Sequence, residues 1–201
     1  DYSCVKGFCP SFVTVTGAKI AVRSAGSPAR LASLIDALPE PAVRKLDASG
    51  CNILVTGIGG TGVLTIGALL GMAAHLDGKG SSVLDMTGMA QKGGAVSSHI
   101  RIDASPEHIH SARLGEGMSD LLLGCDMIVA SGASVLASLR PGHTTAILNT
   151  DVAPTGDFQR NRNLDLNEQR LRSAVIDALD KGPLFELPAS RLATDLTGDS
   201  I

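Results

Sequence analysis

The glycine-rich segment GIGGTG at residues 57–62 interrupts an apolar stretch that carries no charged residue from Cys51 to Ala74. A stretch of this length could cross a membrane as a helix. The glycines argue against that interpretation, because they would place flexible backbone together at one level of the bilayer. A buried strand, a tight turn and a helix account for the same residues. We therefore expect a strand, a glycine loop and a helix in a soluble protein with no membrane partner.

Short apolar runs recur after this unit, and runs of this length are typical of strands buried on both faces of a mostly parallel sheet. The predicted strands are NILVTGI (52–58), SSVLDM (81–86), VSSHIRI (96–102), CDMIVAS (125–131) and TTAILN (144–149). Residues 61–78 are apolar nearly all round, which predicts a helix between the sheet and another surface. The fold class expected over about residues 51–201 is α/β, a Rossmann-like three-layer domain that is truncated at its C-terminus.

The first 50 residues differ in character from the rest. Residues 1–25 contain two cysteines and an alternating apolar stretch that predicts a hairpin with its turn near Gly17. Residues 26–50 are interpreted as a linker with one helix, which begins at Ser27-Pro28 and ends before Pro39. Because the chain begins with Asp and not Met, we expect it to be part of a longer protein.

The C-terminal third predicts one further helix. Asn167 can cap it, and Leu171, Val175 and Leu179 then line one face. The polar residues 151–166 before it are long for a loop in a compact domain and are a candidate contact with a ligand or partner.

The glycine loop is the strongest candidate binding site. Gly57 would permit a tight turn, Gly59 would let a phosphate approach the backbone, and Gly62 would let the helix pack closely on the strand. Gly60 and Thr61 complete the loop, and the free N–H groups where the helix begins attract an anion. The same glycines could instead serve packing alone, without any ligand.

Asp85 stands near the end of the second predicted strand, where a dinucleotide-binding protein places an acidic residue on the ribose hydroxyl groups. It lies later than the usual spacing of about 20 residues after the loop. A self-contained NAD-dependent dehydrogenase that uses the segment 57–62 and Asp85 is therefore the alternative function.

A second candidate binding segment is Gln91-Lys92-Gly93-Gly94, directly before the third predicted strand. A lysine followed by two glycines can combine its ammonium group with exposed backbone N–H groups, which suits a phosphate, a carboxylate or a neighbouring carbonyl. A solvated turn explains the same residues.

Other chemistries have weaker support. The formal net charge of -3 and the absence of long basic runs disfavour nucleic acid as a partner. His108 and His110 share one face of an extended segment but have no third metal ligand nearby. Ser131 and Ser134 lie in no nucleophile elbow. The remaining thiols, Cys51 and Cys125, are expected to be buried as small apolar side chains.

The combination of GIGGTGV, MAQKGGAVSSHIRI and a terminal GDSI resembles the gamma-type domain of 2-oxoacid:ferredoxin oxidoreductases. The opening segment DYSCVKGFCPSFVTV is similar to the segment that precedes this domain in the fused bacterial indolepyruvate:ferredoxin oxidoreductases. The resemblance covers nearly the whole chain and is most specific at residues 1–15 and 57–102. Lys92 stands where many relatives have Arg.

The resemblance implies an enzyme that converts a 2-oxoacid such as indolepyruvate to an acyl-coenzyme A and CO₂ and reduces ferredoxin. Its cofactors would be thiamine diphosphate with Mg²⁺, held mainly by parts outside this chain, and [4Fe-4S] clusters, with coenzyme A as co-substrate. Its partners would be other domains or subunits of the same oxidoreductase, in a cytoplasmic homo-oligomer. No catalytic residue is expected in this chain, which would act by positioning cofactors.

Within this family, residues 1–25 would be the end of an iron–sulfur segment. Cys4 and Cys9, the latter followed by Pro10, would supply two of the four thiolate ligands of a cluster. The other two would lie upstream of Asp1. Two free thiols in a reducing cytosol are the alternative.

Overall fold

The computed structural model describes residues 16–17, 28–40, 46, 50–88, 94–152 and 167–197. Six strands form one sheet: β1 (Cys51–Ile58), β2 (Gly80–Thr87), β3 (Ala95–Asp103), β4 (Leu121–Gly124), β5 (Thr145–Asn149) and β6 (Leu184–Leu187). The helices are α1 (Pro28–Asp36), α2 (Val63–Leu76), α3 (Met127–Ala130), α4 (Ala133–Ser138), α5 (Glu168–Leu179), α6 (Ala189–Thr197) and the 3₁₀ turn η1 (Pro106–His108).

The sheet has the strand order β2-β3-β1-β4-β5-β6. Strand β3 is antiparallel to both of its neighbours, β1 and β2, so that β1 and β2 point the same way with β3 between them. The pairs β1–β4, β4–β5 and β5–β6 are parallel. The prediction of a mostly parallel sheet is therefore confirmed, although the third predicted strand runs against the others.

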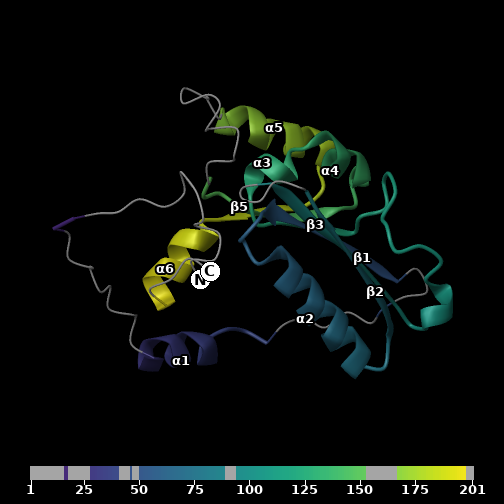
Figure 1. The fold of residues 1–201 in the computed structure, drawn as a ribbon, viewed down its shortest axis with the longest axis horizontal. Helices are drawn as coiled ribbons and strands as arrows, with labels where there is room; N and C mark the ends of the chain where they lie inside the picture. Colours follow the sequence, from purple (N-terminus) through teal and green to yellow (C-terminus); the bar gives the residue numbers. More distant parts are fainter. Residues whose placement is uncertain are drawn as a thin grey trace.

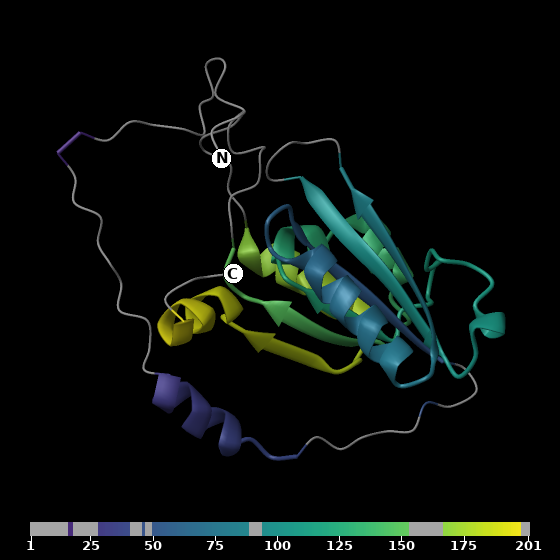
Figure 2. The same cartoon turned by 60° about the horizontal axis from the view of Figure 1, so that its bottom comes forward.

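Helices cover both faces of this sheet, which makes the three layers of the predicted α/β fold. Figure 1 shows α2 on one side and α3, α4 and α5 on the other, and Figure 2 shows α2 (blue) lying across its face of the sheet. Alternate residues of β1 point to opposite faces, so that Val55 faces α2 and Leu54 faces the α3–α5 layer.

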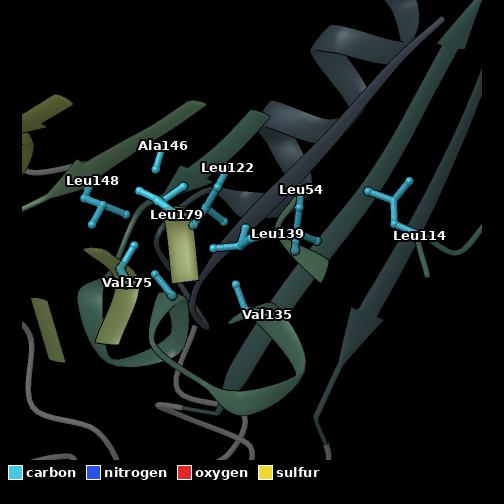
Figure 3. Packing of buried hydrophobic residues seen from close by; sticks show 10 residues of the cluster. Leu54, Leu114, Leu122, Val135, Leu139, Ala146, Leu148, Val175 and Leu179 are labelled. Carbon is cyan, nitrogen blue, oxygen red and sulfur yellow. The ribbon is translucent and has the colours of Figure 1, made fainter. Parts of the chain in front are cut away.

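The two faces enclose separate apolar clusters. On the α2 side, buried Ile53, Val55, Val63, Val96 and Ile100 pack together. On the other side, the cluster shown in Figure 3 joins the sheet residues Leu54, Leu122, Ala146 and Leu148 to helix residues that include Val175 and Leu179. Both clusters consist of aliphatic side chains, as the low aromatic content requires.

Helix α2 approaches the sheet closely through two of its own glycines. A Cβ atom on Gly71 would lie 2.6 Å from Val83 Cγ2, and one on Gly67 would collide with Ser98. The opposite face of α2 is apolar but uncovered, with Leu64, Leu69, Met72 and Leu76 all exposed, Leu76 by 79%. Among the described residues, no second surface covers this side of the helix, so that part of the prediction stays a prediction.

One predicted strand is wrong. Residues 125–131 do not form a strand, because the strand is β4, just before them, and α3 follows. Asp126 explains the change, since its side chain accepts the Val129 N–H at 2.9 Å and so caps α3. Strand β6, helix α4 and helix α6, which begins at Ala189, were not anticipated.

The predicted helices at Pro28 and after Asn167 are confirmed as α1 and α5, and Asn167 Oδ1 accepts the Arg170 N–H at 3.0 Å. The predicted hairpin around Gly17 and most of the polar stretch 151–166 lie outside the described residues. Within the described part of the chain, no helix is both long and apolar enough to cross a membrane.

Candidate functional site

The candidate site lies at the carboxyl ends of β1 and β4, where the chain leaves neighbouring parallel strands toward opposite faces. From β1 it turns into α2 on one face, and from β4 it turns into α3 on the other. In open α/β sheets, ligands bind outside the strand ends at such a point. The glycine loop lies at this edge of the sheet.

The loop itself is a tight turn held by Thr61. Its N–H and its Oγ1 both donate to Ile58 O, at 3.0 and 2.7 Å. Gly60 and Gly62 have φ values of 99° and 78°, which other L-residues rarely adopt. The loop therefore needs glycine at these two positions for its backbone conformation.

The amide groups of the loop suit an anion. The first intrahelical hydrogen bond of α2 runs from Ile66 N–H to Gly62 O, at 2.9 Å. The preceding N–H groups of the first helical turn, at Val63, Leu64 and Thr65, have no acceptor within the helix. Together with the helix dipole, they give this end of α2 a partial positive charge.

Among the described residues, nothing covers the outer side of the loop. A Cβ atom on Gly60 or Gly62 would meet no atom within 4 Å, and one on Gly59 would come no closer than 3.8 Å, to Gly94 O. Packing within the described chain therefore does not explain why residue 59 is a glycine. A ligand or partner group can approach this backbone closely.

The expected role of one glycine needs correction. Gly62 does not mediate close helix-to-strand packing, because its Cβ position is open, and Gly67 and Gly71 provide that packing instead. Gly57 has no positive φ. A Cβ atom there would collide with Thr61 Oγ1, which holds the turn, and would lie 2.8 Å from Val63 Cγ2, so its missing side chain serves both the turn and the packing beneath it.

The second candidate segment adjoins the first. Gly59 N–H donates to Gly94 O at 2.9 Å, and Ile58 pairs with Ala95 across β1 and β3. The antiparallel course of β3 causes this contact, because it returns residue 94 to the edge where β1 ends. Gln91, Lys92 and Gly93 lie outside the described residues.

Asn149, at the end of β5 beside the end of β4, was not predicted from the sequence. Its Nδ2 donates to Cys125 O and Ser190 Oγ at 3.1 and 3.0 Å, and its Oδ1 accepts the N–H groups of Asp151 and Ala189 at 3.1 and 2.9 Å. The residue is 7% exposed. In the sequence, Asn149 is visible only as one amide residue at the end of the apolar run 144–149.

The dehydrogenase alternative loses its geometric basis. Asp85 pairs with Ser98 on β3, and Ser98 pairs in turn with Val55 on β1. A whole strand therefore separates Asp85 from β1, a distance of about 10 Å at the usual strand spacing. In a dinucleotide-binding fold the acidic residue ends the strand beside β1, and here that neighbour is the antiparallel β3.

The remaining candidates add no described ligand to this edge of the sheet. Cys4 and Cys9 lie outside the described residues. His108 Nδ1 lies 2.7 Å from Asp103 Oδ1, a contact that lowers the pKa of this carboxyl group. Among the residues with described positions, no group of three or more His, Cys, Asp or Glu side chains could hold a metal ion.

The remaining thiols, Cys51 and Cys125, are only partly buried. Both pack against the α2-side cluster. Burial, with a smaller effect of Asp126, raises the pKa of the Cys125 thiol, which keeps it neutral.

Comparison with known proteins identifies relatives over most of the sheet domain. The family model described as "pyruvate ferredoxin/flavodoxin oxidoreductase" matches residues 52–201. The indolepyruvate oxidoreductase subunit IorB of Methanothermobacter thermautotrophicus is 33% identical over 110 residues, which are 55% of this chain and 53% of IorB. IorB of Thermococcus kodakarensis is 34% identical over 98 residues, 45% of this chain and 47% of that protein. The chain thus spans about half the length of these relatives.

Solved structures also resemble this chain, at low identity. The PORC subunit of pyruvate oxidoreductase from Thermotoga maritima aligns with 72% of this chain and 65% of its own, with a TM-score of 0.49 and 18% identity. The gamma subunit of a keto/oxoacid ferredoxin oxidoreductase from Geobacter sulfurreducens gives a TM-score of 0.43 at 19% identity, over 72% and 64% of the two chains. Because the family model extends from β1 to the last residue, the chain belongs to the pyruvate ferredoxin/flavodoxin oxidoreductase family.

Proposed function

We propose that this chain is the gamma-type part of a 2-oxoacid:ferredoxin oxidoreductase that acts on an aryl 2-oxoacid such as indolepyruvate. Membership of the family supports the reaction class, and the relatives named as indolepyruvate oxidoreductase subunits support the substrate. The complete enzyme would cleave the 2-oxoacid oxidatively into CO₂ and an acyl-coenzyme A and transfer the electrons to ferredoxin.

In this proposal the chain positions a cofactor and does not itself react. Thiamine diphosphate with Mg²⁺, bound mainly by other parts of the enzyme, would supply the carbanion chemistry. Cys4 and Cys9 would contribute two ligands to a [4Fe-4S] cluster. A cytoplasmic location belongs to the same proposal, because clusters and free thiols suit a reducing compartment.

The open backbone of the glycine loop carries the proposal. Three glycines, Gly59, Gly60 and Gly62, have free space where a side chain would stand, next to the uncapped first turn of α2. An anionic group fits there, because backbone N–H groups can reach it without a side chain in between. A phosphate group of coenzyme A is the anion that this enzyme class would bring. Lys92, two residues before Gly94, would add positive charge.

The uncovered face of α2 supports a second part of the proposal, contact with another domain or subunit of the enzyme. A helix that is apolar all round is normally covered on both sides. Leu64, Leu69, Met72 and Leu76 are exposed apolar residues on the side of α2 opposite the sheet, together with the polar Thr65 and His75. Assembly of several copies of the enzyme is proposed together with this contact.

The test is the variant Gly59→Ala in the complete enzyme. A methyl group fits there sterically, so we expect an unchanged melting temperature and a KM for coenzyme A that is raised at least about tenfold, with the KM for indolepyruvate unchanged. The reverse control is Gly67→Ala, which lies in the packed face of α2 and should lower stability without a selective effect on coenzyme A. The isolated chain should release no CO₂ from indolepyruvate.

Two results would contradict the proposal. Gly59→Ala enzyme with the parental KM for coenzyme A would show that the loop serves packing alone. Decarboxylation of indolepyruvate by the chain 1–201 without other parts would show that the chain is itself catalytic.

A further inference from the structure

A cavity of about 490 Å³ lies on the face of the sheet opposite α2. Strand β3 contributes Ser97 and His99 to its floor, the connection to β4 contributes residues 111–116, and α4 forms the remaining wall. Figure 3 shows three of the apolar lining residues, with Leu54 between Leu114 and Val135. Among the described residues, those that line this cavity belong to a different part of the domain from the glycine loop.

His99 lines this cavity and carries a hydrogen-bond donor. The residue is 7% exposed, and its Nδ1 accepts the Leu114 N–H at 3.2 Å. A nitrogen that accepts a hydrogen bond carries no proton, so the proton of the neutral ring lies on Nε2. Burial, and to a smaller extent Arg113, lowers the pKa of His99, which is consistent with a neutral ring near pH 7.

The other lining groups restrict the ligand further. Arg113 provides a guanidinium group and Glu116 a carboxylate, while Ser97 and Ser134 provide hydroxyl groups. Because one acidic side chain balances the one basic side chain, the lining does not favour a multiply charged phosphate. A single carboxylate can accept from Arg113 and from a ring N–H at the same time.

The rest of the lining is apolar. Leu54, Met86, Leu114 and Val135 face the same space, which suits a hydrocarbon or aromatic body attached to the charged head. The volume lies within the range of cavities that bind small organic ligands, about 300–1,000 Å³. A small molecule with one carboxylate and an apolar body therefore matches both the polar and the apolar parts of the wall.

We propose that this cavity is a binding site for a small apolar monocarboxylate, whose carboxylate accepts hydrogen bonds from His99 Nε2 and the Arg113 guanidinium group. The site is separate from the glycine loop and rests on the described residues alone, so it does not depend on the proposed function. It requires no chemical change of the ligand.

The test uses the chain 1–201 and two matched probes, phenylacetate and the neutral phenylacetamide. Binding is followed by NMR, through the amide signal of Leu114 and the ring signals of His99. We expect saturable shifts with phenylacetate, with a dissociation constant on the order of a millimolar or below for a ligand of this size. Phenylacetamide should bind at least about tenfold more weakly, since it lacks the charge.

Variants locate the site. Arg113→Met, an exposed position that should not affect folding, is expected to weaken phenylacetate binding at least about tenfold. Arg170→Met removes an exposed arginine from α5, outside the cavity, and should leave binding unchanged. His99→Phe removes the ring donor and should have an effect similar to that of Arg113→Met. If His99→Phe fails to fold, the comparison of phenylacetate with phenylacetamide and the binding by Arg113→Met still test the proposal.

Several results would overturn the proposal. These are no saturable shift at millimolar phenylacetate, equal binding of phenylacetamide, or unchanged binding by Arg113→Met. Shifts confined to the amides of Gly60 to Val63 would place the carboxylate at the glycine loop instead. Inorganic phosphate that competes as strongly as phenylacetate would show a general anion site and contradict the monocarboxylate class.

Discussion

Gly67 shows how a single missing methyl group sets the distance between helix and sheet. Alanine is a better helix former than glycine by about 1 kcal/mol, but a Cβ atom on residue 67 would collide with Ser98, whose strand is paired on both sides. Overpacking of this kind costs about 1–3 kcal/mol. We predict that Gly67→Ala lowers the free energy of unfolding, as measured by urea denaturation.

The matched experiment adds Ser98→Gly to the Gly67→Ala chain. This second change removes the atoms that collide with the new methyl group, so part of the lost stability should return. An unchanged urea midpoint in Gly67→Ala alone would mean that α2 can shift away from the sheet without loss.

The lowered pKa of His99 predicts how the free energy of unfolding depends on pH. Burial, with a smaller contribution of Arg113, lowers its pKa in the folded protein below the ordinary value of 6.5. The unfolded chain therefore takes up the proton first as the pH falls. The contribution of His99 to stability should be constant above pH 6.5 and should decrease below pH 6.5, until the folded pKa is passed.

The measurement is the free energy of unfolding in urea at a series of pH values between neutral and mildly acidic. His99→Gln, which does not titrate, should flatten the curve in this window. Curves of equal slope for the two proteins would show that the proton enters His99 equally well in the folded state.

Asn149 ties three elements together at the carboxyl edge of the sheet. Its four hydrogen bonds reach the end of β4 and the start of α6. We predict that Asn149→Ala lowers the free energy of unfolding by about 2–4 kcal/mol, because an unsatisfied buried polar group costs about 1–3 kcal/mol. Hydrogen exchange should accelerate most at the amides of Asp151 and Ala189.

Asn149→Asp is the informative control. It keeps the oxygen that accepts from these two amides but loses the Nδ2 donor to Cys125 O and Ser190 Oγ. Protection of the Ala189 amide should therefore survive in Asn149→Asp and be lost in Asn149→Ala. Equal hydrogen exchange of the Ala189 amide in both variants would mean that the loss of protection comes from fraying of the strand ends and not from loss of the acceptor oxygen of residue 149.

The elements that the sequence predicted correctly have strong local signals. Strand β1, helix α2 and the capped helix α5 follow from uninterrupted apolar runs, a glycine turn and Asn167. Strand β4 was misplaced by a few residues because an apolar run does not distinguish a strand from a short helix. The cap formed by Asp126 decides between the two, and this depends on the side chain's rotamer.

The spatial order of the strands was not available from local patterns. Asp85 stands at the end of a correctly predicted strand, yet a dinucleotide site fails because β3 separates β2 from β1. The contact of Gly59 with Gly94 and the cavity beside His99 arise from the same arrangement. Such features depend on pairing between residues far apart in the chain, which periodicity does not report.

The apolar face of α2 makes a prediction about assembly. Leu69 and Leu76 are 65% and 79% exposed, so a lysine at either position should change the free energy of unfolding by less than about 0.5 kcal/mol. Association with the proposed partner domain or subunit should be lost, because a charge would be buried without a partner. Urea denaturation and size-exclusion chromatography of the mixed components measure the two effects.

Ile176→Lys is the control, since Ile176 is a partly exposed apolar residue on α5, on the other side of the sheet. It should leave association intact. Unchanged assembly in both Leu69→Lys and Leu76→Lys would mean that the face of α2 remains open to solvent in the enzyme.

The position of β3 also bears on the order in which the chain can fold during synthesis. Strands β1, β2 and β3, together with α2, are all contained in residues 51–103 and pair with one another. Strand β1 lies closer in sequence to β3 than to β4, so we expect this half of the sheet to form before β4, β5 and β6 have been synthesised. Strand β1 would then be the edge with which β4 pairs, followed by β5 and β6.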